Sequence, residues 1–287
     1  MNKRNETNKY LVIAGFFIVC TFLFSIWQNN SIVVTQSDFV SESIPDAFDQ
    51  FKIVQISDLH NKQFGEDQER LLDKVRNQMP NIIIVTGDLI DQRKYNLHKA
   101  MIFIRGAVKI APVYYVSGNH EAWSGHYETL KKSLQEAGVT VLDNSVFDFK
   151  MGENSIRLLG VSDPDFLTSS YLEGTNASLL EETLKGWSIE ERENFNILLS
   201  HRPELFDVYH GANIDMVFTG HAHGGQVRLP FVGGIVAPDQ GFFPKYTSGS
   251  YTEGSTTMFV SRGLGNSIVP QRLFNRPEIV VVTLRSK

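Results

Sequence analysis

The chain has 287 residues, enough for one large domain with a substantial core or for two small ones. Apolar residues make up 42% and charged residues 21%, as in an ordinary globular protein, and the net charge is −5 with no long basic run. This balance disfavours nucleic acid as an electrostatically captured partner. The one cysteine, Cys20, excludes a disulfide framework within the chain and a thiolate metal site.

The N-terminus combines a basic flank with an uncharged apolar run. Three basic residues and one acid precede residues 10–27, which are just long enough to span a bilayer core as a helix and have aromatic residues at both ends. We therefore predict a cytoplasmic tail over residues 1–9, a single-pass transmembrane anchor over 10–27, and an extracytoplasmic remainder. A cleaved signal peptide is the competing interpretation, but residues 25–29 offer no good cleavage site.

Beyond the anchor, residues 28–50 are predicted to form a tether and a first strand, and residues 51–287 a folded domain. In that domain, strand-like apolar runs alternate with segments of helical periodicity, which argues for an α/β domain (α+β in detail) with buried early strands. The predicted strands are 51–56, 81–86, 112–116, a hairpin over 146–159, 195–199, 214–218, 227–229, 257–260 and 279–283. The predicted helices are 67–79, 97–108, 126–137, 176–187 and 203–210. Residues 230–256 predict a long ordered loop, and such loops are often functional.

Polar side chains that can bind metal follow five of the predicted strands directly. They include Asp58 and His60 after the first strand, Asp88 and Asp91 after the second, Asn119 and His120 after the third, His201 after residues 195–199, and His221 and His223 after residues 214–218. Ligands in open α/β sheets gather at the carboxyl ends of strands, so we expect these side chains to meet. The other three histidines, at positions 98, 126 and 210, are interpreted as surface or packing residues.

The ligand count suits two metal ions. Asp58, His60, Asp88, Asn119, His201, His221 and His223 make seven ligands, and one bridging carboxylate would give each ion four. Such a nitrogen and oxygen set suits Mn, Fe or Zn, and the sequence does not choose among them. Two ions can lower the pKa of a bridging water and stabilise both oxygens of an in-line displacement at phosphorus.

These motifs, in this order and spacing, resemble the calcineurin-like metallophosphoesterase superfamily from about residue 52 to the C-terminus. Residues 224–230 and 261–265 further resemble a bacterial branch that has an N-terminal membrane or export segment. That branch includes cell-envelope phosphoesterases, and relatives of it hydrolyse UDP-diacylglucosamine. The resemblance implies that residues 51–287 form a metallophosphoesterase domain: a two-sheet β-sandwich flanked by helices, with a dimetal site at the strand ends.

The resemblance also implies roles for the motif residues. Asp58, His60 and His223 would hold the first ion, Asn119, His201 and His221 the second, and Asp88 would bridge the two. His120 would be the general acid or stabilise the transition state, and Asp91 would orient it. The chain departs from the protein-phosphatase branch at Asp91-Gln92-Arg93, where that branch has Asp-Arg-Gly. This departure argues against a phosphoprotein substrate, and Arg202, Arg228 and Arg262 become the candidates for phosphate binding.

We therefore expect a membrane-anchored, metal-dependent phosphodiesterase or pyrophosphohydrolase that uses a metal-bridging hydroxide, with a lipid-linked or cell-envelope substrate. The alternatives are a phosphomonoesterase of the same fold and a metal-binding envelope protein without turnover. A nuclease is disfavoured by the charge and the predicted orientation. Specificity would lie in residues 161–187 and 230–256. The sequence fixes neither the physiological substrate nor the oligomeric state.

Overall fold

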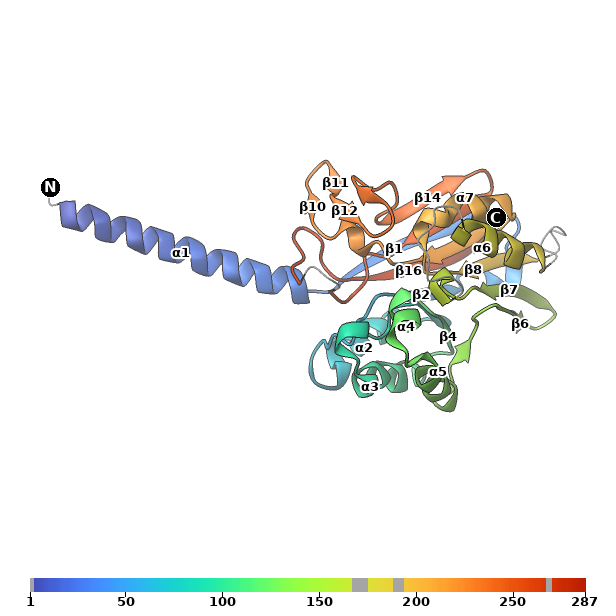
Figure 1. Cartoon of the computed structure of the whole chain (residues 1–287). Helices are drawn as coiled ribbons and strands as arrows, with labels where there is room; N and C mark the ends of the chain where they lie inside the picture. The colour runs from blue at the N-terminus through green and yellow to red at the C-terminus, as the bar shows by residue number, and fades with distance from the viewer. Residues whose placement is uncertain (1–2, 167–174, 188–193, 267–269) are drawn as a thin grey trace.

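The computed structural model describes residues 3–166, 175–187, 194–266 and 270–287. Two sheets pack face to face, helices cover their outer faces, and one long helix projects from the body (Figure 1). The expected fold class, two sheets flanked by helices and preceded by an apolar N-terminal helix, is thereby confirmed.

The first sheet has six strands in the order β1-β16-β2-β3-β4-β5. These are β1 (Val33–Ser41), β16 (Glu278–Ser286), β2 (Lys52–Ile56), β3 (Ile82–Thr86), β4 (Val113–Val116) and β5 (Thr140–Val141). Strands β2 to β5 run parallel, β1 is parallel to β16, and β16 is antiparallel to β2. The carboxyl ends of β2, β3 and β4 therefore share one edge of the sheet.

The second sheet also has six strands, in the order β14-β15-β9-β8-β7-β6. These are β14 (Gly249–Glu253), β15 (Thr256–Val260), β9 (Met216–Thr219), β8 (Phe195–Leu199), β7 (Asn154–Gly160) and β6 (Ser145–Met151). Its four inner strands are parallel, and a hairpin partner closes each edge.

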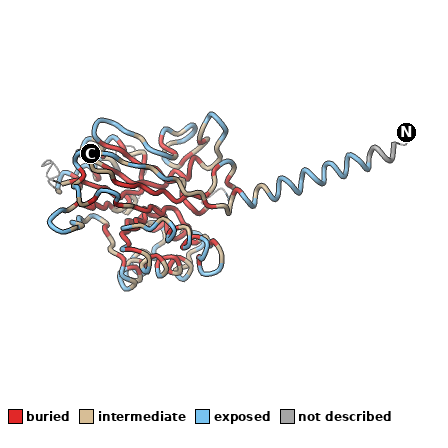
Figure 2. The backbone as a smooth tube through the Cα atoms, turned by 180° about the vertical axis from the view of Figure 1, so that it is seen from behind, coloured by how far each residue is buried: buried red, intermediate tan, exposed pale blue. Residues whose placement is uncertain are grey.

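The core consists of a layer between the sheets and one layer under the helices on each outer face. In β3, Ile82 and Ile84 pack into the layer between the sheets, while Ile83 and Val85 pack under the helices of the first sheet. Both faces of this strand are therefore apolar, which explains its uninterrupted hydrophobic sequence. Figure 2 shows the buried backbone concentrated in the two sheets.

The helices lie close to the predicted positions. They are α1 (Lys3–Asn30), α2 (Glu69–Arg76), α3 (Leu97–Ala107), α4 (Asn119–Ser124), α5 (Tyr127–Glu136), α6 (Thr175–Lys185) and α7 (Phe206–Gly211). Helix α4 was not predicted. Short 3-10 turns include η3 (Gln92–Lys94), η4 (Pro164–Phe166), η5 (Pro203–Leu205) and η6 (His223–Gly225).

The segment expected to be a long loop, residues 230–256, is more structured than predicted. It completes two small hairpins, β10 (Arg228–Leu229) with β11 (Gly233–Gly234) and β12 (Val236–Ala237) with β13 (Gly241–Phe242), and then supplies the edge strand β14. The prediction was incomplete because two-residue strands and a polar edge strand lack the apolar alternation by which strands are recognised.

Helix α1 is long and apolar enough to cross a membrane between Asn8 and Asn30, and its most apolar 18-residue window is unburied, whereas Gln28 near its end is buried against the body. It continues past the predicted end at residue 27, and only residues 31 and 32 separate it from β1. Residues 33–41, part of the segment expected to contain a tether, are an edge strand of the first sheet. The apolar helix is therefore joined to the body by a very short link (Figure 1).

Candidate metal centre

The side chains predicted at the strand ends lie together at one edge of the sandwich. Asp58 and His60 follow β2, Asp88 follows β3, and Asn119 begins α4 three residues after β4 ends. From the second sheet, His201 follows β8, and His221 and His223 follow β9. Parallel strands of both sheets end at this edge, and all seven residues are buried. The fold thus brings together side chains that are far apart in the sequence.

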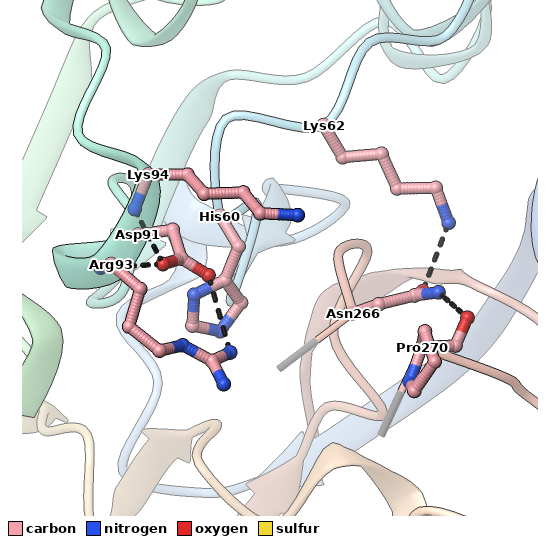
Figure 3. Close-up of a pocket in the computed structure, with 7 residues that line it drawn as sticks. All are labelled: His60, Lys62, Asp91, Arg93, Lys94, Asn266 and Pro270. Atoms are coloured by element: carbon pink, nitrogen blue, oxygen red, sulfur yellow. Dashed lines mark hydrogen bonds and ion pairs between the residues drawn. The ribbon is translucent and has the colours of Figure 1, made fainter. Parts of the chain in front are cut away.

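A cavity of about 580 Å³ opens beside this cluster. His60 and Asp91 line it on the side of the cluster, together with three basic residues (Figure 3). The buried polar cluster therefore has an opening through which a molecule can reach it.

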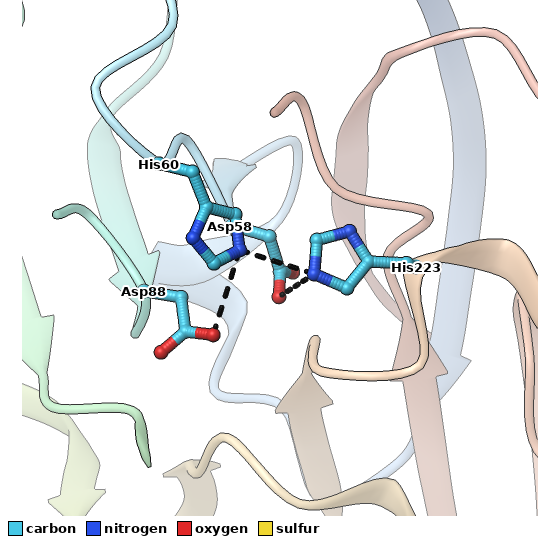
Figure 4. Close-up of side chains that lie close together, drawn as sticks. All are labelled: Asp58, His60, Asp88 and His223. Atoms are coloured by element: carbon cyan, nitrogen blue, oxygen red, sulfur yellow. Dashed lines mark hydrogen bonds and ion pairs between the residues drawn. The ribbon is translucent and has the colours of Figure 1, made fainter. Parts of the chain in front are cut away.

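The first group of side chains consists of Asp58, His60, Asp88 and His223, each with one ligand atom within 4.8 Å of the others. The Nε2 atoms of His60 and His223 lie 3.1 Å apart, and His223 Nε2 lies 3.4 Å from Asp58 Oδ1 (Figure 4). His60 Nε2 is 3.6 Å from Asp88 Oδ2. Four nitrogen and oxygen donors thus converge on one point.

The second group consists of Asp88, His201 and His221, again within 4.8 Å of one another. His201 Nε2 lies 3.3 Å from Asp88 Oδ2, 3.1 Å from Asn119 Oδ1 and 3.2 Å from His221 Nδ1. Asp88 belongs to both groups. The structure therefore places six of the seven predicted ligands in two groups with one shared carboxylate, and Asn119 beside the second group.

The protonation and hydrogen bonding of the first group suit coordination of a divalent cation. Oxygen Oδ2 of Asp58 is buried without a hydrogen-bond partner, and burial raises the pKa of this carboxyl. Burial also lowers the pKa of His60 to about 3 and holds that of His223 well below its usual range, so both imidazoles are neutral at pH 7. Neutral imidazoles and an unpartnered carboxylate oxygen are the groups that Mn, Fe or Zn would coordinate.

Asp88 and His201 form a buried ion pair in the second group. Burial opposes ionisation of Asp88, but His201 and His120 hold the pKa of this carboxyl well below its usual range. Burial likewise opposes protonation of His201, but Asp88 raises the pKa of His201 to about 10. In the metal-free chain, His201 therefore carries a proton that a metal ion must displace.

The backbone at the centre is strained. Five of the seven residues have a left-handed backbone, with φ of 51° at Asp58, 47° at His60, 53° at Asp88, 62° at His221 and 47° at His223. Residues other than glycine rarely adopt this region, and such outliers concentrate at functional sites. The strain was not predicted, because nothing in a residue's identity reports its φ.

Two glycines leave room for the ligands. A Cβ at Gly220 would lie 1.9 Å from Ser57 Oγ and 2.5 Å from Asp58 Oδ2, and one at Gly118 would lie 2.4 Å from Asp88 Oδ1. Any side chain at either position would displace a carboxylate of the centre. The glycines of the Gly118-Asn119 and Gly220-His221 motifs are thus explained by close approach.

His120 and Asp91 lie beside the first group. One ligand atom from each of them and one from His60 all lie within 4.8 Å of one another. The His120 ring makes an edge contact with the His60 ring at a centroid distance of 4.4 Å. Nitrogen Nδ1 of His120 accepts a hydrogen bond from the Gln92 backbone at 3.2 Å, while Asp91 accepts from the backbone of Arg93 and Lys94. The described contact that orients His120 is therefore made by the η3 backbone, which Asp91 caps.

Glu121 is a residue to which sequence reasoning gave no role. Its buried carboxylate accepts backbone hydrogen bonds from Asp88 at 2.8 Å, Ile90 at 3.1 Å and Gly118 at 2.7 Å. It joins the loops after β3 and β4 and so positions both Asp88 and Asn119. Its position in a polar cluster directly after a predicted strand is the sequence feature that could have indicated this role.

Arg202, one of three arginines predicted to bind phosphate, is buried among carboxylates. It donates to Asp163 at 2.7 and 2.9 Å, to Asp165 at 2.8 Å and to Asp239 at 2.5 Å. Asp239 also lies 2.8 Å from Nε2 of His221. Arg202 thus connects the residues around the second group, and sequence reasoning missed Asp163 and Asp239.

The other two arginines lie elsewhere. Arg228 donates to Gly224 O at 2.9 Å and to Thr247 Oγ1 at 3.1 Å, and Arg262 pairs with Glu278 at 2.8 Å. Both are half-buried. Phosphate binding by any of the three arginines stays a prediction.

Comparison with known proteins agrees with this geometry. A family model described as calcineurin-like phosphoesterase matches residues 51–225, and the chain belongs to this family. It is 34% identical over 265 residues to the uncharacterized metallophosphoesterase YkuE of Bacillus subtilis (strain 168), covering 90% of this chain and 87% of that protein. It is 27% identical over 240 residues to the phosphodiesterase YaeI of Escherichia coli (strain K12), covering 82% of each.

A solved structure shows a more distant likeness. The structure of TT1561 from Thermus thermophilus matches with a TM-score of 0.49 and 15% identity, covering 75% of this chain and 90% of that one. The expected superfamily is confirmed by the family model and the relatives. Its members are hydrolases of phosphoesters, and the clustered histidines and carboxylates indicate that this chain binds divalent metal.

Proposed function

We propose that the chain is a dinuclear metal-dependent phosphodiesterase or pyrophosphohydrolase. The observation that carries the proposal is the position of Asp88, whose carboxylate belongs to both groups of donor atoms. A shared carboxylate is what two neighbouring ions require, and a single-ion site would have no use for the second group.

The residues divide between the ions as the two groups do. Asp58, His60 and His223 would hold one ion, and Asn119, His201 and His221 the other. The donor set suits Mn, Fe and Zn equally. When bound, two such ions activate water as a nucleophile and neutralise the oxygens of a phosphoryl group.

His120 is proposed as the residue that stabilises the leaving oxygen in the transition state. Because its Nδ1 accepts a hydrogen bond from the Gln92 backbone, the neutral ring carries its proton on Nε2. Nε2 is therefore the atom that can donate a hydrogen bond to a leaving oxygen and so stabilise the transition state. Asp91 supports this role indirectly, because it caps η3 and thereby holds the Gln92 amide in place.

A diester or pyrophosphate is favoured over a phosphoprotein. The chain has Asp91-Gln92-Arg93 where the protein-phosphatase branch has its phosphate-binding arginine. The relative YaeI, which shares 27% identity, bears the name phosphodiesterase. Both observations support hydrolysis of a phosphate with two substituents.

We also propose that α1 anchors the enzyme in a membrane. The helix is apolar and long enough to span, its most apolar window is unburied, and basic residues precede it. The positive-inside rule then puts the N-terminus in the cytoplasm and the two sheets outside. Anchoring raises the concentration of the enzyme at the bilayer, so a lipid-linked or cell-envelope phosphoester is the proposed substrate class.

The test is Asp88→Ala in the full-length protein, purified in detergent. We expect metal content and hydrolysis of bis-p-nitrophenyl phosphate to be lost together. Asp73→Ala is the matched control, because Asp73 is an exposed carboxylate on α2. Full activity of Asp88→Ala, or hydrolysis by the metal-free wild-type protein, would overturn the two-metal proposal.

A further inference from the structure

The cavity beside the metal centre is lined by more positive than negative charge. Lys62, Arg93 and Lys94 face it, whereas Asp91 is its one lining carboxylate among the described residues. The Arg93 guanidinium lies 3.6 Å from Asp91, which offsets one of the three cations. Figure 3 shows the Lys94 side chain extending into the space between Asp91 and Lys62. Burial lowers the pKa of Lys62 to about 7, so the cavity presents the Lys94 ammonium and a partly protonated Lys62 amine next to the centre.

One wall of this cavity touches the end of the apolar helix. Lys62 Nζ donates to the Asn29 carbonyl in the last turn of α1 at 2.5 Å and to Asn266 Oδ1 at 3.2 Å. Asn266, which also lines the cavity, donates to Asn29 Oδ1 at 3.0 Å. The residues that form the cavity wall are thus bonded directly to the helix.

The end of α1 is also held by several further contacts. Ser25 Oγ donates to Gln271 at 2.7 Å, and the ring of Phe24 lies 5.7 Å from that of Phe274. The guanidinium of Arg276 stacks over the ring of Trp27 at 4.6 Å. Together these contacts hold the end of α1 against the body, so the cavity stays at a fixed distance from the helix.

The same end of the body carries exposed apolar side chains. The segment with β10 to β13 lies at the end of the body from which α1 leaves (Figure 1). Phe231, Phe242 and Phe243 of this segment are among the most exposed large apolar side chains of the described residues. Together with Trp27, which is 48% exposed, they suit the interfacial region of a bilayer. The cavity is therefore close to the surface of the membrane in which α1 would lie.

We propose that the cavity between Lys62, Arg93 and Lys94 binds a second negatively charged group of an anionic membrane lipid whose scissile phosphate lies at the metal centre. A lipid diphosphate is the simplest substrate of this class. The inference rests on the proposed function, since it names the substrate of that site. Two amines beyond the metals are unnecessary for a simple diester, whose one charge is at the scissile phosphate, but they match a headgroup with a further charge.

The test measures kcat/KM for three substrates. The full-length protein is reconstituted into phosphatidylcholine vesicles, and metal is supplied. The three probes are bis-p-nitrophenyl phosphate, a water-soluble short-chain prenyl diphosphate, and a long-chain prenyl diphosphate in the bilayer. The variant is Lys62→Met/Lys94→Met. The matched control is Lys109→Met/Lys132→Met, which removes the same charge from exposed positions on the helical face of the first sheet.

For Lys62→Met/Lys94→Met, we expect kcat/KM for the long-chain diphosphate to fall about tenfold more than kcat/KM for bis-p-nitrophenyl phosphate, at unchanged metal content. The control should lower neither. Equal losses on both substrates, or no loss on the diphosphate, would overturn the inference. A soluble diphosphate cleaved as well as the lipid would show that the cavity binds a free anion and would refute the lipid assignment.

The two proposals fail separately. If the wild-type protein with metal bound hydrolyses none of the probes, the proposed function fails. If it hydrolyses bis-p-nitrophenyl phosphate but its preference is insensitive to Lys62 and Lys94, only the lipid subsite fails.

Discussion

Replacing Arg202 with methionine should destabilise the folded protein by about 3–5 kcal/mol, the usual cost of breaking a buried ion pair by removing one partner. The Arg202 and Asp163 side chains are only 2% and 0% exposed, and two hydrogen bonds join them. Methionine fills part of the volume but leaves the Asp163 carboxylate buried and unpaired. Asp239 contributes less to this cost, because its side chain is 37% exposed and water can solvate it.

The assay is thermal unfolding of the metal-free, full-length protein in detergent, in a double-mutant cycle with Asp163→Leu. Removing both charges should recover part of the loss, with a coupling energy of about 1–3 kcal/mol. Arg157→Met is the control, because its pair with Asp148 is partly exposed and should contribute at most about 1 kcal/mol.

The same experiment tests whether Arg202 binds the substrate phosphate. If it does so without a structural role, Arg202→Met leaves the unfolding temperature unchanged and raises KM. That result would refute the reasoning from burial. We expect instead a lower unfolding temperature and reduced occupancy of the second ion, because Arg202 and His221 share Asp239 as a partner.

Three further predictions concern the centre. Glu121→Gln should cost about 2–3 kcal/mol in thermal unfolding, because an amide cannot accept all three backbone hydrogen bonds that the carboxylate accepts; an unchanged unfolding temperature would contradict this. His120→Asn should slow hydrolysis while metal analysis finds both ions retained, whereas a non-catalytic metal protein would show no turnover to lose. Metal binding at pH 7 should release protons to a pH indicator and tighten as the pH rises towards about 10, because Asp88 raises the pKa of His201 to about 10; affinity independent of pH would count against a protonated His201.

The sheets could be predicted from sequence where burial makes a strand apolar throughout. Ile82 to Val85 pack on both faces, so their hydrophobicity alone marks a strand. Strand β14 (Gly249–Glu253) is an exposed edge with no such pattern. Helix α4 has only 6 residues, and Glu121 in its first turn accepts hydrogen bonds from the Gly118 amide and from Ile90 in the loop after β3. Neither element has a local signal that sequence periodicity can detect.

The clustering of the candidate metal ligands could be predicted because each is close behind a strand that was itself recognisable. The network around Arg202 could not, because its partners Asp163 and Asp239 are 39 and 37 residues away in irregular segments. The extent of α1 was also missed. Asn29 and Asn30 look like the start of a polar linker, but their amides bond to the carbonyls of Ser25 and Ile26 and continue the helix.

The left-handed backbone at the centre results from the short distance between each candidate ligand and the strand before it. Asp58, Asp88 and His221 each lie two residues beyond the end of a strand, so the chain must turn at once to aim their side chains at a common point. Such a conformation costs about 1–3 kcal/mol for each non-glycine residue. Longer loops would relieve the strain but would let the ligands move. The rigid sheets on either side hold the strained turns in place, and the same short connections that strain the backbone keep the donor atoms of the two groups in contact.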